Sequence, residues 1–214
     1  MQTSDEYQKT AAIYDLLFSG ALKPIRHNIK TFLRHSKAKA VLDLCCGTGE
    51  QLRILDGNDM LLTGVDLSQA MLARARQVSP ESIHYLEADA SNLPLPDSEY
   101  DGIIICLALH EKPTRQHEAI FKEACRLVKP EGHIVIADYS IPPPGFKSIV
   151  PGKILIPIIE RLAGLNHYTS YKYWIKHGGI RGFLEREHSG KVTLIAPHFK
   201  GCINIVTLSN IKKK

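Results

Sequence analysis

The chain has 214 residues, of which 44% are hydrophobic and 23% charged, a composition typical of one folded globular domain and not of a disordered chain. Its net charge of +5 permits nucleic-acid binding without indicating it. The polar start and five cysteines without metal-binding spacing predict a cytoplasmic protein with no signal peptide, disulfide framework or metal site.

Short apolar runs alternate with helical segments as far as residue 140. The runs that predict strands are residues 40–44, 61–67, 82–89, 102–109 and 133–139. The segments that predict helices are residues 50–55, 69–78 and 114–128. Uninterrupted Ile, Val and Leu runs are typical of strands covered by helices on both faces. The alternation therefore predicts an α/β fold with a parallel, doubly wound sheet.

The pattern changes after Ser140. We expect an apolar segment over residues 149–164 and a helix over residues 171–186. The last two runs, "KVTLIAPHF" and "CINIVTLS", alternate in polarity and are joined by "KG", which predicts an antiparallel hairpin. No internal repeat or long linker divides the chain, so it is expected to form one domain.

The stretch "VLDLCCGTGE", residues 41–50, places Asp43 before a turn that contains Gly47 and Gly49. A dinucleotide-binding loop needs a third glycine, which lets the pyrophosphate approach the helix that follows. That glycine is missing, and Glu50 would place a negative charge at the phosphate position. Both features disfavour a nicotinamide-dependent dehydrogenase.

Acidic residues end or follow three successive predicted strands: Asp43, Asp66 and Asp89. Ligands of open parallel sheets bind at the carboxyl ends of the strands, so the three acids are expected to form one site. S-adenosylmethionine carries an ammonium, a sulfonium, a ribose diol and an adenine, and no phosphate. Asp43 would attract the ammonium end, Asp66 would accept both ribose hydroxyls, and Asp89 would accept from the adenine amino group.

Four stretches resemble, in order and spacing, the motifs of class I S-adenosylmethionine-dependent methyltransferases. They are "VLDLCCGTGE", "GVDLSQAMLARAR", "EADASNLPLPDSEYDGIII" and "EACRLVKPEGHIVIADY", which together cover about residues 40–140. The wording "LDLCCGTG" is most similar to the ubiquinone/menaquinone C-methyltransferase branch. This resemblance implies a Rossmann-like, seven-stranded, mostly parallel sheet that ends in an antiparallel C-terminal hairpin.

Residues 1–214 are accordingly interpreted as a single methyltransferase domain in four parts. The expected parts are N-terminal lid helices (1–35), a cofactor-binding core (40–140), an acceptor-side helical cap (145–190) and the terminal hairpin (191–210). The resemblance implies cofactor contacts at Tyr14, Asp43, Cys45, Gly47, Thr48, Gly49, Asp66, Leu67, Met71, Asp89, Ala90 and Cys106.

Several of these assignments have an ordinary structural alternative. Cys45 stands where the family usually has its first glycine, and its side chain would narrow the pocket. Cys45 and Cys46 are interpreted as packing residues and not as nucleophiles. The stretch "DASN" that begins at Asp89 also fits turn chemistry, and Tyr14 fits core packing equally well.

The acceptor side is less defined. His110 follows the fourth strand and would suit a general base, although a residue at the rim without a catalytic role fits equally. The expected function is methyl transfer to a small, apolar, lipid-like or quinone-like acceptor by in-line attack. RNA methylation and a catalytically silent S-adenosylmethionine-binding module remain alternatives. Residues 149–164 would cap the sheet, line an apolar channel or touch a membrane surface, and nucleic acid is not an expected partner.

Overall fold

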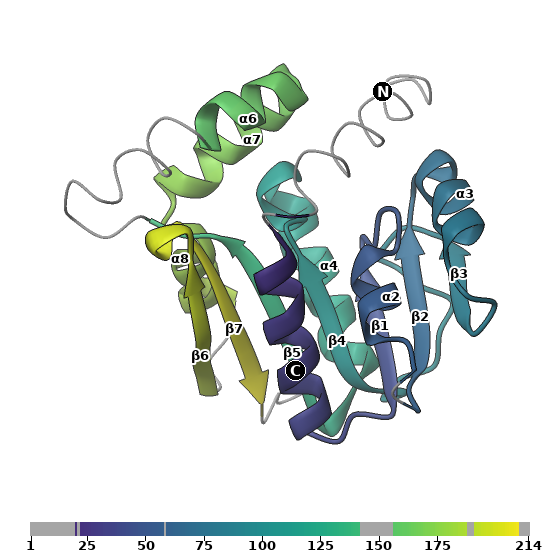
Figure 1. Cartoon of the computed structure of the whole chain (residues 1–214). Helices are drawn as coiled ribbons and strands as arrows, with labels where there is room; N and C mark the ends of the chain where they lie inside the picture. Colours follow the sequence, from purple (N-terminus) through teal and green to yellow (C-terminus); the bar gives the residue numbers. More distant parts are fainter. Residues whose placement is uncertain (1–19, 21, 58, 142–155, 188–190, 210–214) are drawn as a thin grey trace.

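The computed structural model describes residues 20, 22–57, 59–141, 156–187 and 191–209. Seven strands form one sheet in the order β3-β2-β1-β4-β5-β7-β6 (Figure 1). The strands are β1 (Ala40–Leu44), β2 (Leu61–Asp66), β3 (Ile83–Glu87), β4 (Tyr100–Cys106), β5 (Val128–Tyr139), β6 (Lys191–His198) and β7 (Ile203–Ser209). The helices that connect the strands and form the region after β5 are α2 (Glu50–Leu55), α3 (Gln69–Val78), α4 (Thr114–Leu127), α6 (Ile156–Ala163), α7 (Leu165–Lys176) and α8 (Gly179–Glu187).

The first five strands are parallel, as the uninterrupted apolar runs predict. β1 pairs with both β2 and β4, β2 pairs with β3, and β4 pairs with β5. The chain therefore winds outward in one direction from β1 and in the other from β4. The crevice between these two strands at their carboxyl ends is where doubly wound sheets bind ligands.

The predicted C-terminal hairpin is confirmed. β7 is antiparallel to both β5 and β6, and β6 forms one edge of the sheet. The connection is longer than "KG", because a 3-10 turn over Phe199–Gly201 follows β6. Phe199 and Lys200 both adopt positive φ angles in this turn, 47° and 59°.

Helices cover both faces of the sheet (Figure 1). A helix over residues 22–35 and α2 lie on one face, and α4 and α8 lie on the other. Ile25, Ile29 and Leu33 repeat every four residues along the first of these helices and are fully buried. The described part of the expected N-terminal lid therefore packs on the sheet, because one of its faces is apolar. Residues 1–19 lie outside the described part of the chain.

The helix expected over residues 171–186 is two helices. α7 ends at Lys176, and Gly178 and Gly179 follow with positive φ angles of 97° and 59°. This glycine pair changes the direction of the chain. α7 therefore packs with α6, and these two helices are called the cap below, while α8 packs against the sheet beside α4. The rings of Phe121 in α4 and Phe183 in α8 meet edge to face, with centroids 5.6 Å apart.

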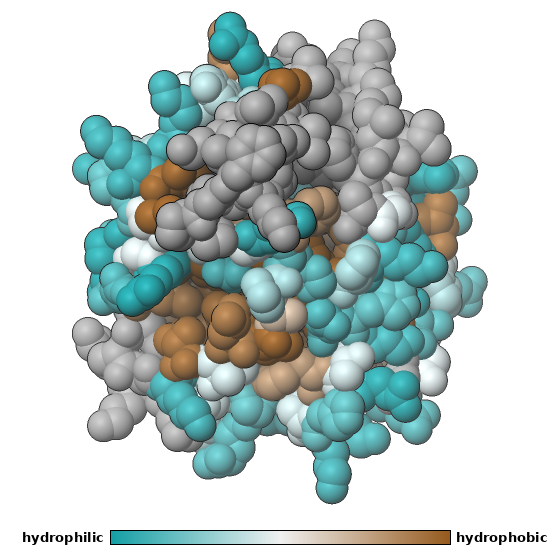
Figure 2. Space-filling view, turned by 60° about the vertical axis from the view of Figure 1, so that its left-hand side comes forward, coloured by the Kyte–Doolittle hydropathy of each residue, from teal (hydrophilic) through white to brown (hydrophobic). Residues whose placement is uncertain are grey.

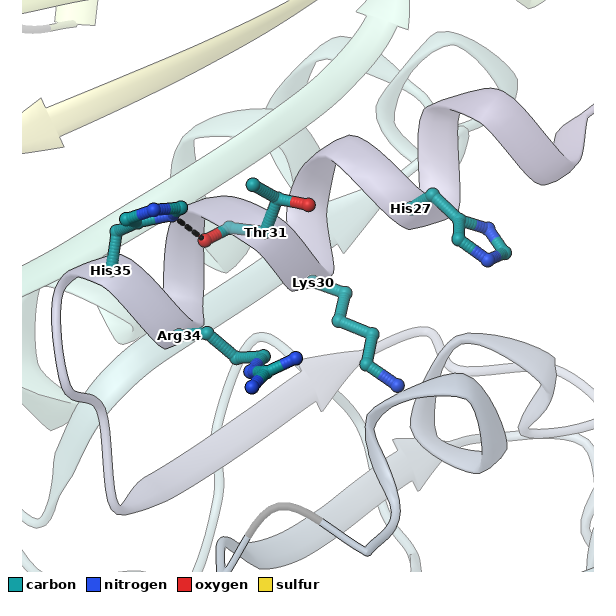
Figure 3. Close-up of a pocket in the computed structure, with 5 residues that line it drawn as sticks. All are labelled: His27, Lys30, Thr31, Arg34 and His35. Atoms are coloured by element: carbon teal, nitrogen blue, oxygen red, sulfur yellow. Dashed lines mark hydrogen bonds between the residues drawn. The ribbon is translucent and has the colours of Figure 1, made fainter.

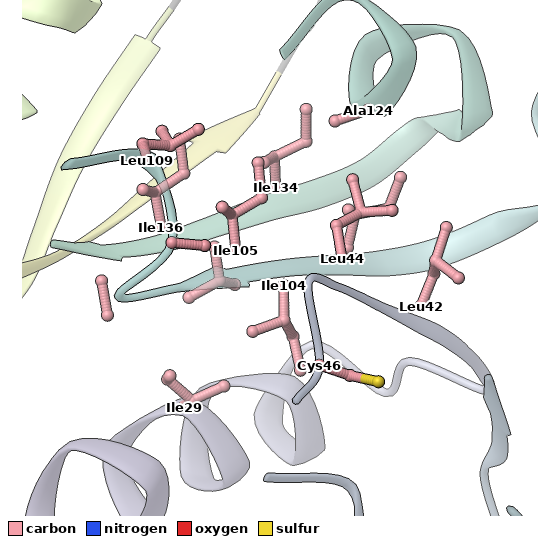
Figure 4. Close-up of a cluster of buried hydrophobic side chains, with 14 of the residues drawn as sticks. Ile29, Leu42, Leu44, Cys46, Ile104, Ile105, Leu109, Ala124, Ile134 and Ile136 are labelled. Atoms are coloured by element: carbon pink, nitrogen blue, oxygen red, sulfur yellow. The ribbon is translucent and has the colours of Figure 1, made fainter. Parts of the chain in front are cut away.

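The core beneath the carboxyl edge consists of side chains from the central strands. Figure 4 shows Ile29 of the N-terminal helix beside Ile104 of β4 on one face of the sheet, and Leu42 and Leu44 of β1 with Ile136 of β5 on the other face. All five side chains are fully buried. Each contributes roughly 1.5–3 kcal/mol to folding, so the loops that follow β1 and β4 are mounted on a rigid platform.

Candidate cofactor and acceptor site

The loop between β1 and α2 turns through three residues with left-handed backbone conformation. Cys45, Gly47 and Gly49 have φ angles of 60°, 54° and 74°. L-amino acids other than glycine adopt this conformation at a cost of about 1–2 kcal/mol, which explains why a glycine would suit position 45. The loop is fastened to β2, because the backbone N–H of Cys46 donates to the Val65 carbonyl at 2.9 Å.

Gly49 has a packing role that the sequence does not reveal. A Cβ atom at this position would lie 2.0 Å from the Tyr85 hydroxyl oxygen. Tyr85 comes from β3 and bonds to the Ser79 hydroxyl at 2.8 Å, which fixes its ring against the loop. The absence of a side chain at Gly49 therefore accommodates Tyr85, whatever ligand the loop contacts.

Asp66 ends β2 and organises the glycine loop. Its Oδ2 accepts from the Gly47 N–H and its Oδ1 from the Ser68 N–H, both at 2.8 Å. Ser68 in turn caps α3 by accepting from the Met71 N–H. Burial raises the pKa of Asp66, while the Ser68 and Gly47 bonds oppose that rise. Each carboxylate oxygen can accept more than one bond, so this geometry fits a ligand that presents two hydroxyls.

Asp43 is the most deeply buried of the three acids, with 2% of its surface exposed. Burial raises its pKa to about 8, the Arg26 charge opposes the rise, and the Asp66 charge adds to it. A carboxyl group in this setting ionises readily only when a cation approaches. The site therefore suits the ammonium group of an amino-acid moiety.

Arg26 is a residue of this site that the sequence analysis missed. It projects from the helix over residues 22–35, and its Nη2 lies 3.0 Å from Glu50 Oε2. Its charge acts on both Asp43 and Cys106, so it lies by the crevice between β1 and β4. Its Nη1 atom is buried and has no hydrogen-bond partner within the described part of the chain. A buried donor in this state fits an anionic ligand group.

Asp89 lies two residues beyond the end of β3, not within a strand. Its Oδ1 accepts from the Ser91 N–H at 2.9 Å and from the Ser91 hydroxyl at 2.7 Å. These bonds lower the pKa of Asp89. The local turn foreseen as an alternative is thus present, and the exposed carboxylate still faces solvent, where a ligand can reach it. The adenine role stays a prediction.

The other predicted cofactor residues surround the same edge. Ala90 and Thr48 are buried, Met71 is half-buried, and Leu67 is 71% exposed beside Asp66. Tyr14 lies outside the described residues. Cys45 and Cys106 are partly buried, and burial raises the pKa of each thiol to about 12. An uncharged thiol at neutral pH agrees with the interpretation of Cys45 as a packing residue and not a nucleophile.

His110 occupies a different environment from the one expected of a rim residue. It lies in the 3-10 turn Leu109–Glu111 after β4 and is 2% exposed. Its Nδ1 is 2.8 Å from Asp138 Oδ1, and its Nε2 is 3.6 Å from Glu160 Oε1. Burial disfavours the charged ring, but the two carboxylates outweigh burial and raise the pKa of His110 to about 10. A general base must be unprotonated, so this setting does not favour that role.

A hollow among the described residues lies away from these side chains and could be mistaken for a site. It lies along the outer side of the helix over residues 22–35 and is lined by His27, Lys30, Thr31, Arg34 and His35 (Figure 3). None of the predicted site residues borders it.

Within the same described ranges, no group of three His, Cys, Asp or Glu side chains is arranged to bind a metal. No helix there is long and apolar enough to cross a membrane.

Residues 41–132 match the family model described as "Methyltransferase domain". A 27-O-demethylrifamycin SV methyltransferase of Amycolatopsis mediterranei is 30% identical, over 48% of this chain and 39% of that protein. A demethylmenaquinone methyltransferase of Staphylococcus epidermidis is 32% identical, over 64% of this chain and 59% of that protein. The chain thus spans between about two fifths and three fifths of the length of these relatives.

Among solved structures, an O-methyltransferase family protein from Burkholderia thailandensis has the same fold over 95% of this chain and 60% of that chain. Its TM-score is 0.71 at 14% identity. The strand order, the domain match and the relatives agree with one another. Residues 41–132 therefore form an S-adenosylmethionine-dependent methyltransferase domain, and the chain is similar to the quinone methyltransferase-like branch of the class I enzymes.

Proposed function

We propose that this protein transfers a methyl group to a small, apolar, quinone-like acceptor. The cofactor supplies, when bound, a methyl group activated by a sulfonium. The observation that carries the proposal is the pair of acids at the carboxyl ends of β1 and β2, because Asp43 and Asp66 fit a cationic nucleoside better than a diphosphate.

Four side chains divide the work of holding the cofactor. Asp66 presents two oxygens, already oriented by backbone N–H groups, to the ribose hydroxyls. Asp43 supplies the negative charge for the ammonium, and the unpartnered Nη1 of Arg26 supplies a donor for the neighbouring carboxylate. Asp89 provides the acceptor for the adenine amino group. Positioning of this kind can supply about 7–11 kcal/mol of a reaction barrier, which is enough without a general base.

An apolar acceptor is supported by the side chains near the carboxyl edge. Ile141 follows β5 and is 56% exposed, and Ile158 and Leu165, at α6 and the start of α7, are 51% and 72% exposed. Figure 2 shows that the main hydrophobic surface on this side of the molecule lies lower, at the level of the edge strands β6 and β7. The names of the relatives, a menaquinone precursor methyltransferase among them, point to acceptors of the same character. Residues 149–155, for which membrane contact was also expected, lie outside the described residues.

The test is methyl transfer from radiolabelled S-adenosylmethionine to demethylmenaquinone, with transfer RNA offered in parallel. We expect label in the lipid-extractable quinone and none above background in the RNA. The Asp66→Ala variant serves as the inactive control. Label in RNA alone would replace the proposal with RNA methylation. Tight S-adenosylhomocysteine binding without transfer to either acceptor, or to other hydroquinones, would favour a silent binding module.

A further inference from the structure

Three ionisable side chains from three separate elements meet in the interior beneath the cap. His110 comes from the turn after β4, Asp138 from β5 and Glu160 from α6. They are 2%, 0% and 1% exposed, respectively. The imidazole lies between the two carboxylates, 2.8 Å from Asp138 on the Nδ1 side and 3.6 Å from Glu160 on the Nε2 side. The sequence separates Asp138 and Glu160 from His110 by 28 and 50 positions, so only the fold brings them together.

Asp138 is a fixed part of the sheet edge. Its Oδ2 accepts from the Leu109 N–H at 3.0 Å, and its Oδ1 accepts from the Tyr139 N–H at 2.7 Å. These bonds hold the turn that carries His110 against β5. Because β5 and the turn are tied together in this way, the imidazole presents its other nitrogen, Nε2, in a defined direction.

Glu160 is the member that belongs to the cap. Its Oε1 accepts from the Tyr139 hydroxyl at 2.8 Å and lies on the Nε2 side of His110. The Tyr139 and His110 rings meet edge to face, with centroids 4.4 Å apart, so together they form a polar socket for the carboxylate. A buried carboxylate without such partners would destabilise the fold. The packing of α6 on the sheet therefore depends on the Tyr139 and His110 side chains that contact the Glu160 carboxylate.

We propose that His110 and Glu160 are positioning residues that form a buried ionic clasp, with the imidazolium of His110 held by Asp138 and closed by Glu160 of α6, which fixes the α6–α7 cap on the carboxyl edge of the sheet. A second contact lies beside it, since His167 of α7 is 3.3 Å from Glu111 in the same turn. The clasp rests on the proposed function only in that this edge is taken as the acceptor side.

The charges around His110 are consistent with a protonated ring. The titratable groups that face it or act on it come from the turn, α4, β5, α6 and α7, and are Glu111, His117, Asp138, Tyr139, Glu160, His167 and Tyr171. The two carboxylates in closest contact raise the pKa of His110 against the opposing effect of burial. The imidazolium is therefore present at neutral pH and loses its proton only in alkali, so His110 acts as a constant support and not as a physiological pH switch.

The cap contains a built-in reporter. Trp174 is the single tryptophan of the chain and lies in α7, 2% exposed. Its Nε1–H donates to the Tyr139 carbonyl at 2.8 Å, next to the clasp. Accessibility of Trp174 to acrylamide, and hydrogen exchange of backbone amides in residues 156–176, both measure whether the cap is docked.

The experiment compares Glu160→Gln with Glu123→Gln in the full chain at pH 7.5. Glu123 is a matched control, because it is a buried glutamate whose partners, Arg126 and the Leu93 N–H, lie away from the cap. Glu160→Gln should accelerate amide exchange in residues 156–176 at least tenfold and raise acrylamide quenching of Trp174. Exchange in residues 40–87 and affinity for S-adenosylhomocysteine should change less than twofold. Glu123→Gln should leave cap exchange unchanged.

Two further measurements separate a clasp from ordinary packing. The double variant His110→Gln/Glu160→Gln should show less cap opening than the product of the two single effects, because each single variant leaves an uncompensated partner. Nitrogen NMR of labelled histidine should show His110 as an imidazolium at pH 8 in the wild type.

Should Glu160→Gln destabilise the whole chain, Tyr139→Phe removes one bond to the same carboxylate and should open the cap to a smaller extent. Unchanged cap exchange in Glu160→Gln, or a neutral His110 at pH 8, overturns the clasp. None of these readouts uses an acceptor, so they are independent of the quinone proposal.

Discussion

Replacing Asp66 by alanine is expected to weaken cofactor binding by about 100-fold. Its two carboxylate oxygens each accept one backbone N–H at 2.8 Å and are thereby aimed as a pair. Each hydrogen bond to a charged group contributes about 1.5–3 kcal/mol, so losing two ribose contacts removes about 3 kcal/mol at the lower limit. That loss corresponds to about two orders of magnitude in Kd.

Isothermal calorimetry with S-adenosylhomocysteine measures this change directly. The matched control is Asp101→Ala, because Asp101 Oδ2 also accepts two backbone N–H groups, those of Lys39 and Ala40, but does so at the opposite edge of the sheet. Asp101→Ala should lower the thermal midpoint and leave Kd within about twofold, since it orients backbone and no ligand. A Kd for Asp66→Ala within threefold of the wild type would refute the ribose assignment.

Three further predictions concern the same edge. Arg26→Ala should weaken S-adenosylhomocysteine binding at least tenfold. It should leave the affinity for 5′-methylthioadenosine, which lacks the carboxylate, within twofold of the wild type. Equal losses of affinity for the two ligands would contradict the carboxylate role of Arg26. Because burial raises the pKa of Asp43 to about 8 and a bound ammonium favours its ionised form, binding should release a proton and strengthen by up to about tenfold per pH unit from pH 6 to 8. Asp43→Asn should abolish that dependence in calorimetry. Gly49→Ala should lower the thermal midpoint by several degrees more than Gly47→Ala, because a Cβ clashes with Tyr85 only at position 49; equal midpoints would contradict the packing role.

The sheet could be predicted from the sequence because its strands are nearly continuous apolar runs. Residues 103–105 of β4 and 134–137 of β5 are fully buried and are all Ile, Val or Ala, so no helical period competes there. The cap was harder. The region over residues 165–187 has helical composition throughout, and only the Gly178–Gly179 pair marks where one helix ends and the next begins.

The acids of the candidate site could be found for a similar reason. Asp43 and Asp66 interrupt or end apolar strands, and parallel strands bring their carboxyl ends together in any fold of this class. Arg26 carried no such signal, because a cation on the polar side of an amphipathic helix is usually solvated. Its burial depends on Glu50 and on the packing of that helix over β1 and β4, which a single sequence does not specify.

The sequence was sufficient to predict the position of His110 but not its chemical environment. Its place after β4 indicated the acceptor side, and the structure puts it at that edge. Its chemistry follows from Asp138 and Glu160, which lie 28 and 50 positions further along the chain and share no motif with it. Glu160 did leave a trace, as an acid within the apolar stretch "IPIIERLAGL", because a charge on a buried helix face requires a partner.

The buried acids at this edge differ in how far their hydrogen bonds are satisfied. On the β4–β5 side, the Asp138 and Glu160 carboxylates are 0% and 1% exposed and already have donors, which are the Leu109 and Tyr139 N–H groups, the Tyr139 hydroxyl and the His110 ring. On the β1–β2 side, burial raises the pKa of Asp43 to about 8, and the nearby Arg26 is 3.0 Å from Glu50. A cation therefore gains most by binding beside Asp43 and little by binding beside the clasp. This asymmetry supports the proposal that a positively charged cofactor binds at β1 and that an uncharged, apolar acceptor binds on the cap side.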